Sequence, residues 1–413
     1  MRVCLLSPER YPHDPRIALE ARGLVDAGHD AVLLCRGEEG DPGREMVADL
    51  DVDRLPVEDP LFDAEGTPES LGYAASTTHS AWESGISRLD NEMPVDAVHV
   101  HGLALAKTGL EVGEDLGVPV VLDLAADPVA RLAGRREARG AKALVGQPGA
   151  LVSRALTPTR RLRRLESSSV SRADRIVVAS EEARARYIRE RDVPHEKVRV
   201  VQSTVDLVPF DEASDQGPVG LDFSPDDEFI TTYAGPIVPE RGLETLVDAF
   251  AQVGEVLPDA RLILVGDGPD DYTDDLHERA ARAGVGDRVT HATRAGPEHV
   301  PAHLALCDAS VLPFPESDYA ETALPHTLFR SFAAGTPAVV GDVPPLRRVV
   351  TRVDAGVVAT DSYTDLAAAL RVLGRNPRRA AALGANGRRA VERGSAFDAA
   401  RDRVAVARAY DEL

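Results

Sequence analysis

The sequence is short of lysine, and its charge is strongly of one sign. Lysine occurs only at Lys107, Lys142 and Lys197, arginine supplies nearly all the positive charge, and the 413 residues carry a formal net charge of −21. Because nucleic acids are bound by basic surfaces, this balance excludes a nucleic-acid partner. An acidic, lysine-poor, arginine-rich chain is typical of salt-adapted microbes with GC-rich genomes. We therefore interpret the acidity as a halophilic habitat and not as a site.

Cysteines, aromatic residues and long apolar runs are also scarce. The three cysteines, Cys4, Cys35 and Cys307, lie in or beside apolar segments, so we expect buried free thiols and a reducing cytoplasm. No run of about 18 apolar residues occurs, and no charged start precedes an apolar stretch, so we expect neither a spanning helix nor a secretion signal. The prediction is a cytoplasmic protein, with peripheral attachment at the inner face of the membrane as an open alternative.

Short β-branched segments alternate with helical ones along the chain, from RVCLLS near the start to PAVVG in the last third. This alternation predicts βαβ units and parallel sheets. At roughly 100 to 200 residues per domain, the length suits two domains. An acidic segment rich in Pro and Gly, 209–227, marks the boundary. The expected parts are an N-terminal domain over 1–208, a C-terminal domain over 209–390, and a final helix over 391–413 that packs back on the N-terminal domain.

The first strand lacks the glycine-rich turn of nicotinamide enzymes, since PERYPHDPR follows it instead of Gly-x-Gly-x-x-Gly. This disfavours a dehydrogenase. In the second half, YAGPIVPERGLETLVDAF predicts a strand, a turn at Gly235, and a helix led by Arg241 and Gly242. The free N–H groups of a helix start, with a cation beside them, suit a diphosphate. A solvated arginine is the alternative when this segment is taken alone.

A second helix start lies in ALPHTLFRSFAAGTPAVV, where Pro325 opens a helix that ends at Gly335. We expect it to point into the crevice beyond the strand ends, with three residues in its first turn: His326, Thr327 and Leu328. The acidic loop before it holds Glu316 and Glu321. Ordinary solvated loop charge explains these two glutamates as well as a functional role does.

The order of these segments resembles the retaining, nucleotide-sugar-dependent glycosyltransferases of family four. VGDGP and the closing AAGTP belong to the same series, and the N-terminal half agrees through YPHDPR and DAVHVHG. The motifs are individually weak, but their shared order covers nearly the whole chain. The resemblance implies the GT-B fold: an α/β protein with two Rossmann-like, doubly wound domains facing across a cleft.

The resemblance also implies a nucleotide-diphosphate sugar on the C-terminal domain and a glycan or lipid-linked acceptor on the N-terminal domain. Arg241 takes the place of the family's lysine at the diphosphate and keeps its charge. The catalytic groups stay unassigned, with Glu316 and Glu321 as candidates. No metal or cofactor is expected, since neither Asp-x-Asp nor a zinc spacing of Cys and His occurs. The implied donor residues are Gly235, Arg241, Gly242, Arg294, Ala295, Pro325, His326, Thr327 and Leu328, and the acceptor side is Asp14, Arg16 and His101.

Four positions depart from the family pattern. Pro236 stands where an arginine is usual, and Arg330 replaces the glutamate that holds the ribose, so it cannot accept the same hydrogen bonds. Ala125 and Ala126 replace a His-Asp or His-Glu pair. We therefore expect slow or absent turnover with common donors. Three hypotheses stay open: an active glycosyltransferase, a degenerate homologue that binds or regulates, and a GT-B nucleotide-sugar epimerase.

The segment 131–166 is basic within an acidic chain. Nine arginines and Lys142 oppose only Glu137 and Glu166, a local charge of +8. Pairing with acidic neighbours in the fold explains this as well as function does. The functional hypothesis is peripheral docking on anionic lipid head groups, because each basic residue near such a surface contributes about 1 kcal/mol.

Overall fold

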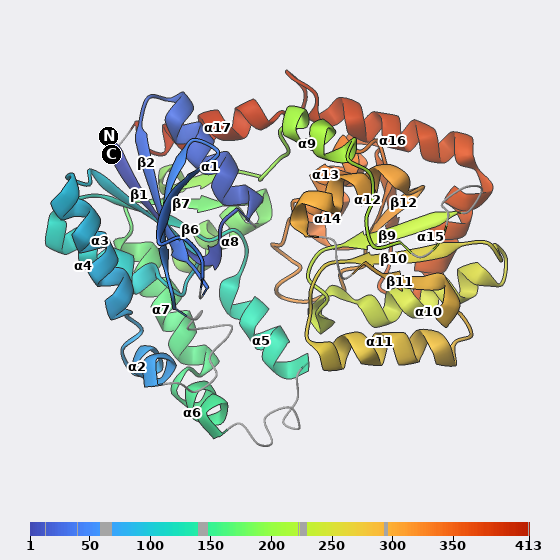
Figure 1. Cartoon of the computed structure of the whole chain (residues 1–413), viewed down its shortest axis with the longest axis horizontal. Coiled ribbons are helices and arrows are strands. Elements are labelled where there is room, and N and C mark those ends of the chain that lie inside the picture. The colour runs from blue at the N-terminus through green and yellow to red at the C-terminus, as the bar shows by residue number, and fades with distance from the viewer. Residues whose placement is uncertain are drawn as a thin grey trace. The chain divides into compact units, whose positions relative to one another are not determined.

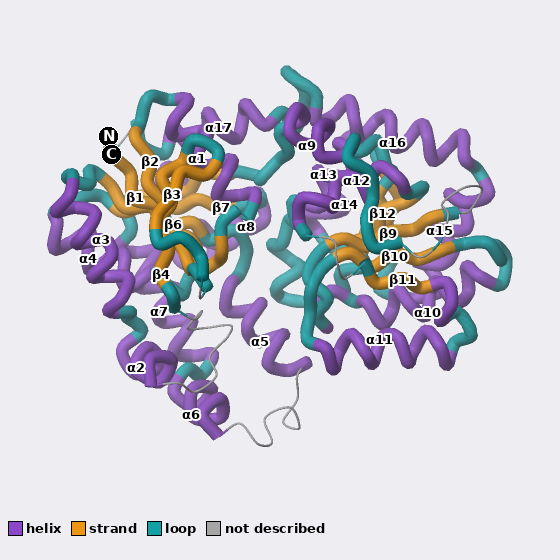
Figure 2. The backbone as a smooth tube through the Cα atoms, viewed as in Figure 1, coloured by secondary structure: helices purple, strands orange, loops and turns teal. Residues whose placement is uncertain are grey.

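The computed structural model describes residues 1–12, 14–38, 40–57, 68–138, 148–221, 223, 229–292, 296–411 and 413. The chain divides into two compact units: unit 1 comprises Met1–Ser203 and Ala400–Leu413, and unit 2 comprises Thr204–Ala399. In each unit the strands gather into one sheet that is flanked by helices (Figure 1 and Figure 2). The chain therefore passes between the units twice.

The sheet of unit 1 has the strand order β3-β4-β2-β1-β5-β6-β7-β8. Its neighbours are parallel except at the edge, where β3 runs antiparallel to β4. The strands are β1 (Arg2–Arg10), β2 (Asp30–Arg36), β3 (Arg44–Val47), β4 (Leu50–Leu55), β5 (Ala97–His101), β6 (Val120–Asp123), β7 (Arg175–Val178) and β8 (Val198–Val200). The order reverses between β1 and β5, a place where open α/β sheets bind ligands.

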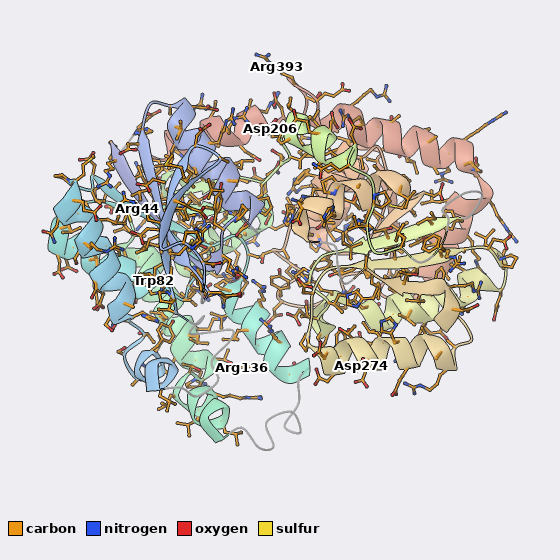
Figure 3. The ribbon with its side chains drawn as sticks, in the orientation of Figure 1. Arg44, Trp82, Arg136, Asp206, Asp274 and Arg393 are labelled. Carbon is orange, nitrogen blue, oxygen red and sulfur yellow. The ribbon has the colours of Figure 1, made fainter. Side chains whose placement is uncertain are left out.

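The helices of unit 1 enclose an apolar core around this sheet. β1 is buried along nearly its whole length, as expected for a strand with helices on both faces. Trp82 of α3 is fully buried in the same core (Figure 3). The helices are α1 (Pro15–Asp26), α2 (Pro68–Ser76), α3 (Ser80–Glu92), α4 (Ala106–Leu116), α5 (Pro128–Ala138), α6 (Pro148–Leu156), α7 (Thr159–Arg172), α8 (Glu181–Arg191) and α17 (Ala399–Arg408).

The sheet of unit 2 is parallel throughout its described strands and has the order β11-β10-β9-β12-β13-β14. Numbered within the unit, this is the Rossmann order 3-2-1-4-5-6, which reverses between β9 and β12. The strands are β9 (Ile230–Ala234), β10 (Arg261–Val265), β11 (Val289–His291), β12 (Ala309–Leu312), β13 (Ala338–Gly341) and β14 (Gly356–Ala359).

The helices of unit 2 pack on this sheet through apolar stripes. In α10 the buried residues Leu243, Leu246, Val247 and Phe250 recur at the spacing of one helix face. The helices are α9 (Leu207–Ser214), α10 (Leu243–Gly254), α11 (Asp270–Arg282), α12 (Val300–Leu306), α13 (Thr327–Ala333), α14 (Pro344–Val353), α15 (Tyr363–Arg375) and α16 (Pro377–Val391).

The predicted α/β architecture with parallel sheets is confirmed, apart from the antiparallel edge strand β3. The three cysteines are buried and free, as predicted. Within the described residues, no helix combines the length and apolarity that crossing a bilayer requires. The sequence predicts domain changes after residues 208 and 390, while the units change after Ser203 and Ala399. The first of these differs because α9 packs on α12 and α13 of unit 2.

Candidate functional site

Arg241 lies just beyond the carboxyl end of β9, at the end of a short 3-10 helix, η3 (Pro239–Arg241). Its side chain is buried, and its Cζ lies 4.6 Å from the centre of the Phe314 ring and 5.5 Å from that of Tyr319. Burial lowers the pKa of Arg241, but Tyr319 and Tyr233 outweigh it and raise the pKa above its usual value. The Nε atom makes no hydrogen bond within the described part of the chain. A buried cation with a donor to spare suits an anionic ligand.

Two glycines let the backbone close in around Arg241. Gly242, which follows it, has φ 74° and caps α10, and a Cβ there would lie 2.1 Å from the Pro313 carbonyl oxygen. Gly266, after β10, has φ 141°, and its Cβ would lie 2.0 Å from the carbonyl oxygen of Gly235. The ends of three neighbouring strands therefore converge here. The first amides of α10, which have no acceptor within the helix, begin at the same place.

The start of α13 lies close to Arg241. Burial first, and then the positive charges of Arg330 and Arg241, lower the pKa of His326 to about 3. The imidazole of His326 is therefore neutral at pH 7. The Leu328 amide donates a hydrogen bond to the Pro325 carbonyl at 3.1 Å.

The remaining predicted positions are more exposed or lie outside the described residues. Glu316 and Glu321 are exposed in the loop between β12 and α13, which also carries Tyr319. Pro236 is exposed, and its carbonyl accepts a hydrogen bond from the Tyr233 hydroxyl at 2.6 Å. Ala125 and Ala126, in unit 1, follow β6. Two predicted donor residues, Arg294 and Ala295, lie outside the described residues.

Of the three residues predicted for the acceptor side, Arg16 and His101 meet at Asp123, whereas Asp14 caps α1. Arg16 is buried, and its Nε and Nη2 donate to the Asp123 carboxylate at 2.5 and 2.9 Å. Burial raises the pKa of Asp123, but Arg16 and His101 outweigh it and hold the pKa well below its usual range. Asp14 instead accepts a hydrogen bond from the backbone N–H of Arg16 at 2.8 Å.

His99 and His101 share one face of β5, and their rings stack with centres 4.8 Å apart. Oε2 of Glu20, on α1, lies 3.4 Å from Nε2 of His99 and 3.5 Å from Nε2 of His101. Burial, and then Asp123, raises the pKa of Glu20 to about 8. Burial lowers the pKa of His99 well below its usual value. For His101, Glu20 and Asp123 outweigh burial and raise the pKa.

The sequence motifs do not single out Glu20, Asp123, Phe314 or Tyr319. Two of these carried a signal: Glu20 lies one helical turn after Arg16, and Asp123 ends a buried strand. The pairing of Arg241 with two aromatic rings has no such signal, because the rings belong to a loop distant in sequence.

Two family profiles match the chain, one in each unit. Residues 14–203 match the Glycosyl transferase 4-like domain, and residues 222–390 match Glycosyl transferases group 1. The chain belongs to the group 1 glycosyltransferases. The second match contains η3, α10 and α13, and therefore all the described residues around Arg241.

Relatives of this glycosyltransferase share about a quarter to a third of the aligned residues. A GDP-mannose-dependent alpha-(1-6)-phosphatidylinositol monomannoside mannosyltransferase of Mycobacterium tuberculosis is 30% identical over 37% of this chain and 40% of its own length. A D-inositol 3-phosphate glycosyltransferase of Segniliparus rotundus is 27% identical over 69% of this chain and 57% of its own. The chain thus spans less than two thirds of these curated relatives.

Solved structures confirm the expected GT-B fold. Sucrose-phosphate synthase of Thermosynechococcus elongatus has a TM-score of 0.71 at 19% identity and covers 94% of this chain and 93% of that one. Anabaena HepE, solved with UDP and glucose, has a TM-score of 0.71 at 16% identity and covers 100% of both chains.

In this glycosyltransferase the basic segment 131–166 is partly neutralised by the fold. Nη1 of Arg163 lies 2.7 Å from Asp127. Arg136, which Figure 3 labels, donates to the backbone carbonyl of Thr157 at 2.6 Å. Residues 139–147 lie outside the described residues. Of the arginines of this segment that the structure describes, Arg154, Arg160 and Arg164 are exposed.

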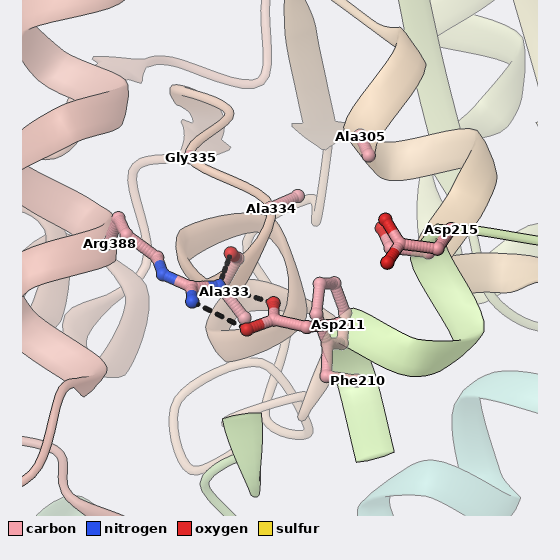
Figure 4. A pocket seen from close by; sticks show the side chains of 9 residues that line it. Phe210, Asp211, Asp215, Ala305, Ala333, Ala334, Gly335 and Arg388 are labelled. Atoms are coloured by element: carbon pink, nitrogen blue, oxygen red, sulfur yellow. Dashed lines mark hydrogen bonds and ion pairs between the residues drawn. The ribbon is translucent and has the colours of Figure 1, made fainter. Parts of the chain in front are cut away.

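Unit 2 of the glycosyltransferase also has a pocket of about 360 Å³ between α9, α12, α13 and α16 (Figure 4). Asp211 and Arg388 face one another in its wall, joined by two hydrogen bonds of 2.7 Å. The pocket shares no lining residue with the surroundings of Arg241. The pocket is therefore separate from the candidate site around Arg241.

Proposed function

We propose that this chain transfers a sugar from a nucleotide-diphosphate donor to a glycan or lipid-linked acceptor. The observation that carries the proposal is Arg241, a buried guanidinium stacked on Phe314 and Tyr319 at the reversal point of a Rossmann sheet. When the glycosidic bond breaks, negative charge grows on the departing diphosphate. Arg241 and the first amides of α10 would stabilise that charge.

The relatives support this class of donor and acceptor. The mycobacterial relative is GDP-mannose-dependent and acts on a phosphatidylinositol mannoside by name, and HepE was solved with UDP and glucose. Both nucleotides therefore belong among the donors to be tested. The acceptor class includes lipid-linked sugars for the same reason.

The substitutions predict weak turnover. Arg330 stands near His326, where the resemblance implies a glutamate for the ribose, and its charge contributes to the low pKa of His326. Pro236 offers no side-chain donor to phosphate. We expect transfer on some donor at a low rate. A homologue that binds nucleotide without transfer is the alternative that the assay below separates.

The test compares nucleotide binding with sugar transfer. Calorimetry would measure binding of UDP, GDP, ADP and the matching nucleosides. Release of nucleotide diphosphate from the corresponding sugars would be followed with cell extract as the acceptor pool. We expect the diphosphates to bind more tightly than their nucleosides. Binding without transfer would support the regulatory hypothesis, and absence of both would refute the donor site.

Arg241→Ala should weaken diphosphate binding by roughly 10- to 150-fold, the effect of about 1.5 to 3 kcal/mol for a hydrogen bond to a charged group. Nucleoside binding should barely change, and Arg241→Lys should retain part of the affinity. Arg261→Ala is the matched control, since Arg261 also stacks on a ring but begins β10 at the opposite end of the sheet. Equal losses for diphosphate and nucleoside would assign Arg241 a structural role.

We also propose that α6 docks unit 1 on an anionic membrane surface. Three large apolar side chains of this short helix are exposed, Leu151 (49%), Val152 (48%) and Leu156 (38%). Arg154 and, at the start of α7, Arg160 and Arg164 are exposed near them. Apolar side chains flanked by arginines are what an interfacial helix presents to lipid.

Flotation with vesicles containing anionic lipid, at graded salt, would test the docking. The chain should bind at low salt, and serine at Leu151, Val152 and Leu156 together should abolish binding. Val372→Ser, at an exposed valine on α15 of unit 2, should have no effect. Absence of binding at every salt concentration that keeps the protein folded would exclude the proposal.

A further inference from the structure

Unit 1 encloses four metal-ligating side chains, of which only His101 is among the residues predicted for the acceptor side. They come from three elements: Glu20 from α1, His99 and His101 from β5, and Asp123 from β6. All four are buried, and one nitrogen or oxygen atom of each lies within 4.8 Å of the others. No sequence motif joins these four residues, because β5 and β6 become neighbours only when the sheet forms.

Hydrogen bonds at the outer nitrogens fix both imidazole rings. Nδ1 of His101 lies 3.1 Å from Asp123, whose carboxylate is ionised because it also accepts from Arg16. Asp123 is therefore the acceptor, and Nδ1 of His101 carries the proton. Nδ1 of His99 lies 2.6 Å from the Tyr410 hydroxyl. In metal centres, the ring nitrogen that does not bind the metal is commonly held in this way, often by a carboxylate.

The inner atoms face one another without hydrogen bonds. Within the described residues, no hydrogen bond reaches Nε2 of either histidine or the carboxylate oxygens of Glu20, although Nη2 of Arg16 lies 3.2 Å from Oε1. Nε2 of His101 directs a lone pair toward a carboxylate oxygen, which is repulsive unless a positive species lies between them. That species is either a proton or a metal ion.

The nitrogen–oxygen distances favour the ion. A proton shared between nitrogen and oxygen draws them to about 2.7 to 3.2 Å. The two nitrogen–oxygen distances here are 3.4 and 3.5 Å. Two ligands at about 2.0 to 2.1 Å from a tetrahedral ion lie about 3.3 to 3.4 Å apart. The spacing is thus that of neighbouring ligands around an ion.

We propose that Glu20, His99 and His101 bind a divalent transition-metal ion, for which Zn²⁺ is the best fit. Two imidazoles and one carboxylate form a nitrogen-rich set that suits zinc and not the oxygen-seeking Mg²⁺ or Ca²⁺. Arg16 and Asp123 neutralise one another, so a bound ion would displace the proton of Glu20 and meet the single negative charge of its carboxylate. The ion ties α1 to β5 and, through Tyr410, to the C-terminal segment of unit 1.

Metal analysis of the full chain, purified without a histidine tag, tests the site directly. We expect one zinc ion per chain. Because the ligands are buried, metal exchange should be made by unfolding in urea with a chelator and refolding with Co²⁺. A tetrahedral cobalt site gives strong visible absorption, and Zn²⁺ should displace it. Either ion should raise the midpoint of thermal unfolding.

Glu20→Gln and His101→Gln each remove one ligand with little change of shape, and His277→Gln is the matched control. His277 also lies beside another histidine, His291 of unit 2, with ring centres 6.1 Å apart. The two ligand variants should lose the cobalt absorption and weaken zinc binding by more than the roughly 10- to 100-fold typical of lost second-shell partners. His277→Gln should behave as the wild type does.

Three results would overturn the proposal: a folded chain that refolds without taking up zinc or cobalt, equal loss in His277→Gln, or cobalt absorption that survives in both ligand variants. If the ligand variants do not fold, X-ray absorption at the zinc edge of the wild type decides. Two imidazoles with oxygen support the site, and any other ligand set refutes it. None of these readouts depends on sugar transfer.

Discussion

Gly242 lies in a left-handed backbone conformation between Arg241 and α10. A Cβ at Gly242 would meet the Pro313 carbonyl oxygen at 2.1 Å, with φ 74°. Gly284 has φ 75° but nothing within 4 Å of its Cβ position. We predict that Gly284→Ala costs about 1 to 2 kcal/mol in the free energy of unfolding, the left-handed penalty alone. Gly242→Ala should cost about 2 to 5 kcal/mol, because overpacking adds to that penalty.

Urea unfolding of both glycine variants would measure this difference. Calorimetry with nucleotide diphosphate should further show weaker binding for Gly242→Ala, since the clash displaces the backbone that carries Arg241. Gly284→Ala is the control for the backbone effect. An equal loss in the free energy of unfolding for the two variants would mean that the loop at Pro313 moves aside at little cost.

Glu166, on α7, is a buried carboxylate surrounded by arginines. Arg186 and Arg191 each donate to it at 2.9 Å. Burial raises the pKa of Glu166, but these hydrogen bonds outweigh it and lower the pKa to about 2. The folded pKa is therefore below the unfolded value. The stability that Glu166 contributes is present above about pH 4.5 and is lost as the pH falls toward 2.

We predict that Glu166→Gln lowers the free energy of unfolding by about 3 to 5 kcal/mol at pH 7, because the arginines lose a buried partner. Below pH 4.5 the difference from wild type should shrink. Urea unfolding at several pH values measures both effects. Glu190→Gln is the control, since Glu190 lies 3.3 Å from the same Arg186 but its side chain is 54% exposed. A constant difference between pH 7 and 3 would contradict the prediction.

Among single residues, the sequence identifies those whose partners lie close by in the chain. Arg241 and Gly242 stand out because a strand, a turn and a helix start follow one another in the chain. Tyr410 does not, since its partner His99 is 311 positions away. The +8 of segment 131–166 also overstates its surface charge, because Asp127, which neutralises Arg163, lies outside the segment.

Among the elements, α9 is fixed to the rest of unit 2 by Arg388 of α16. Arg388 donates to both carboxylate oxygens of Asp211 at 2.7 Å and to the Ala333 carbonyl at 2.6 Å (Figure 4). The hydrogen bonds from Arg388 lower the pKa of Asp211. Its contribution is therefore present above the unfolded pKa and is lost as the pH falls through the lower folded value.

We predict that Arg388→Gln lowers the free energy of unfolding by about 1 kcal/mol more than Asp211→Asn does. The reason is that Arg388→Gln also removes the hydrogen bond to the Ala333 carbonyl in the last turn of α13. The coupling between the two side chains should be only about 0.2 to 1 kcal/mol, since both are partly exposed. Urea unfolding of the double-mutant cycle measures both quantities.

Arg279 and Asp248 form the matched pair, also joined by two hydrogen bonds but between α10 and α11. Arg279→Gln and Asp248→Asn should differ less from one another in the free energy of unfolding than Arg388→Gln and Asp211→Asn do. Equal effects of Arg388→Gln and Asp211→Asn would show that the bond to Ala333 contributes nothing measurable.

Element type follows well from the alternation of apolar and helical segments, which predicts the parallel sheets. The boundary region is harder to predict. Residues 209–227 are acidic and rich in Pro and Gly, yet α9 ends within this stretch, at Ser214. The buried Phe210 and the bonds from Arg388 hold it, and neither produces a periodic pattern.

For the whole molecule, the net charge of −21 predicts a stability that depends on salt. Self-repulsion of like charges opposes the compact state and is screened over about 10 Å at 0.1 M salt and about 3 Å at 1 M. We predict that the midpoint of thermal unfolding rises from low salt to about 1 M KCl. Sucrose at equal osmolality controls for water activity. A midpoint that falls with KCl would show that ion pairs matter more than net repulsion.

The two passages of the chain between the units set an order for its synthesis. Unit 2 is continuous in sequence, but unit 1 needs residues 400–413, which supply the Tyr410 partner of His99 and the Asp402 carboxylate that accepts from the backbone N–H of Gln202. On the ribosome, the unit that begins first is therefore completed last. Until then His99 and Glu20 lack the segment that covers them. That interval gives a metal ion its opportunity to reach a site that the finished fold buries.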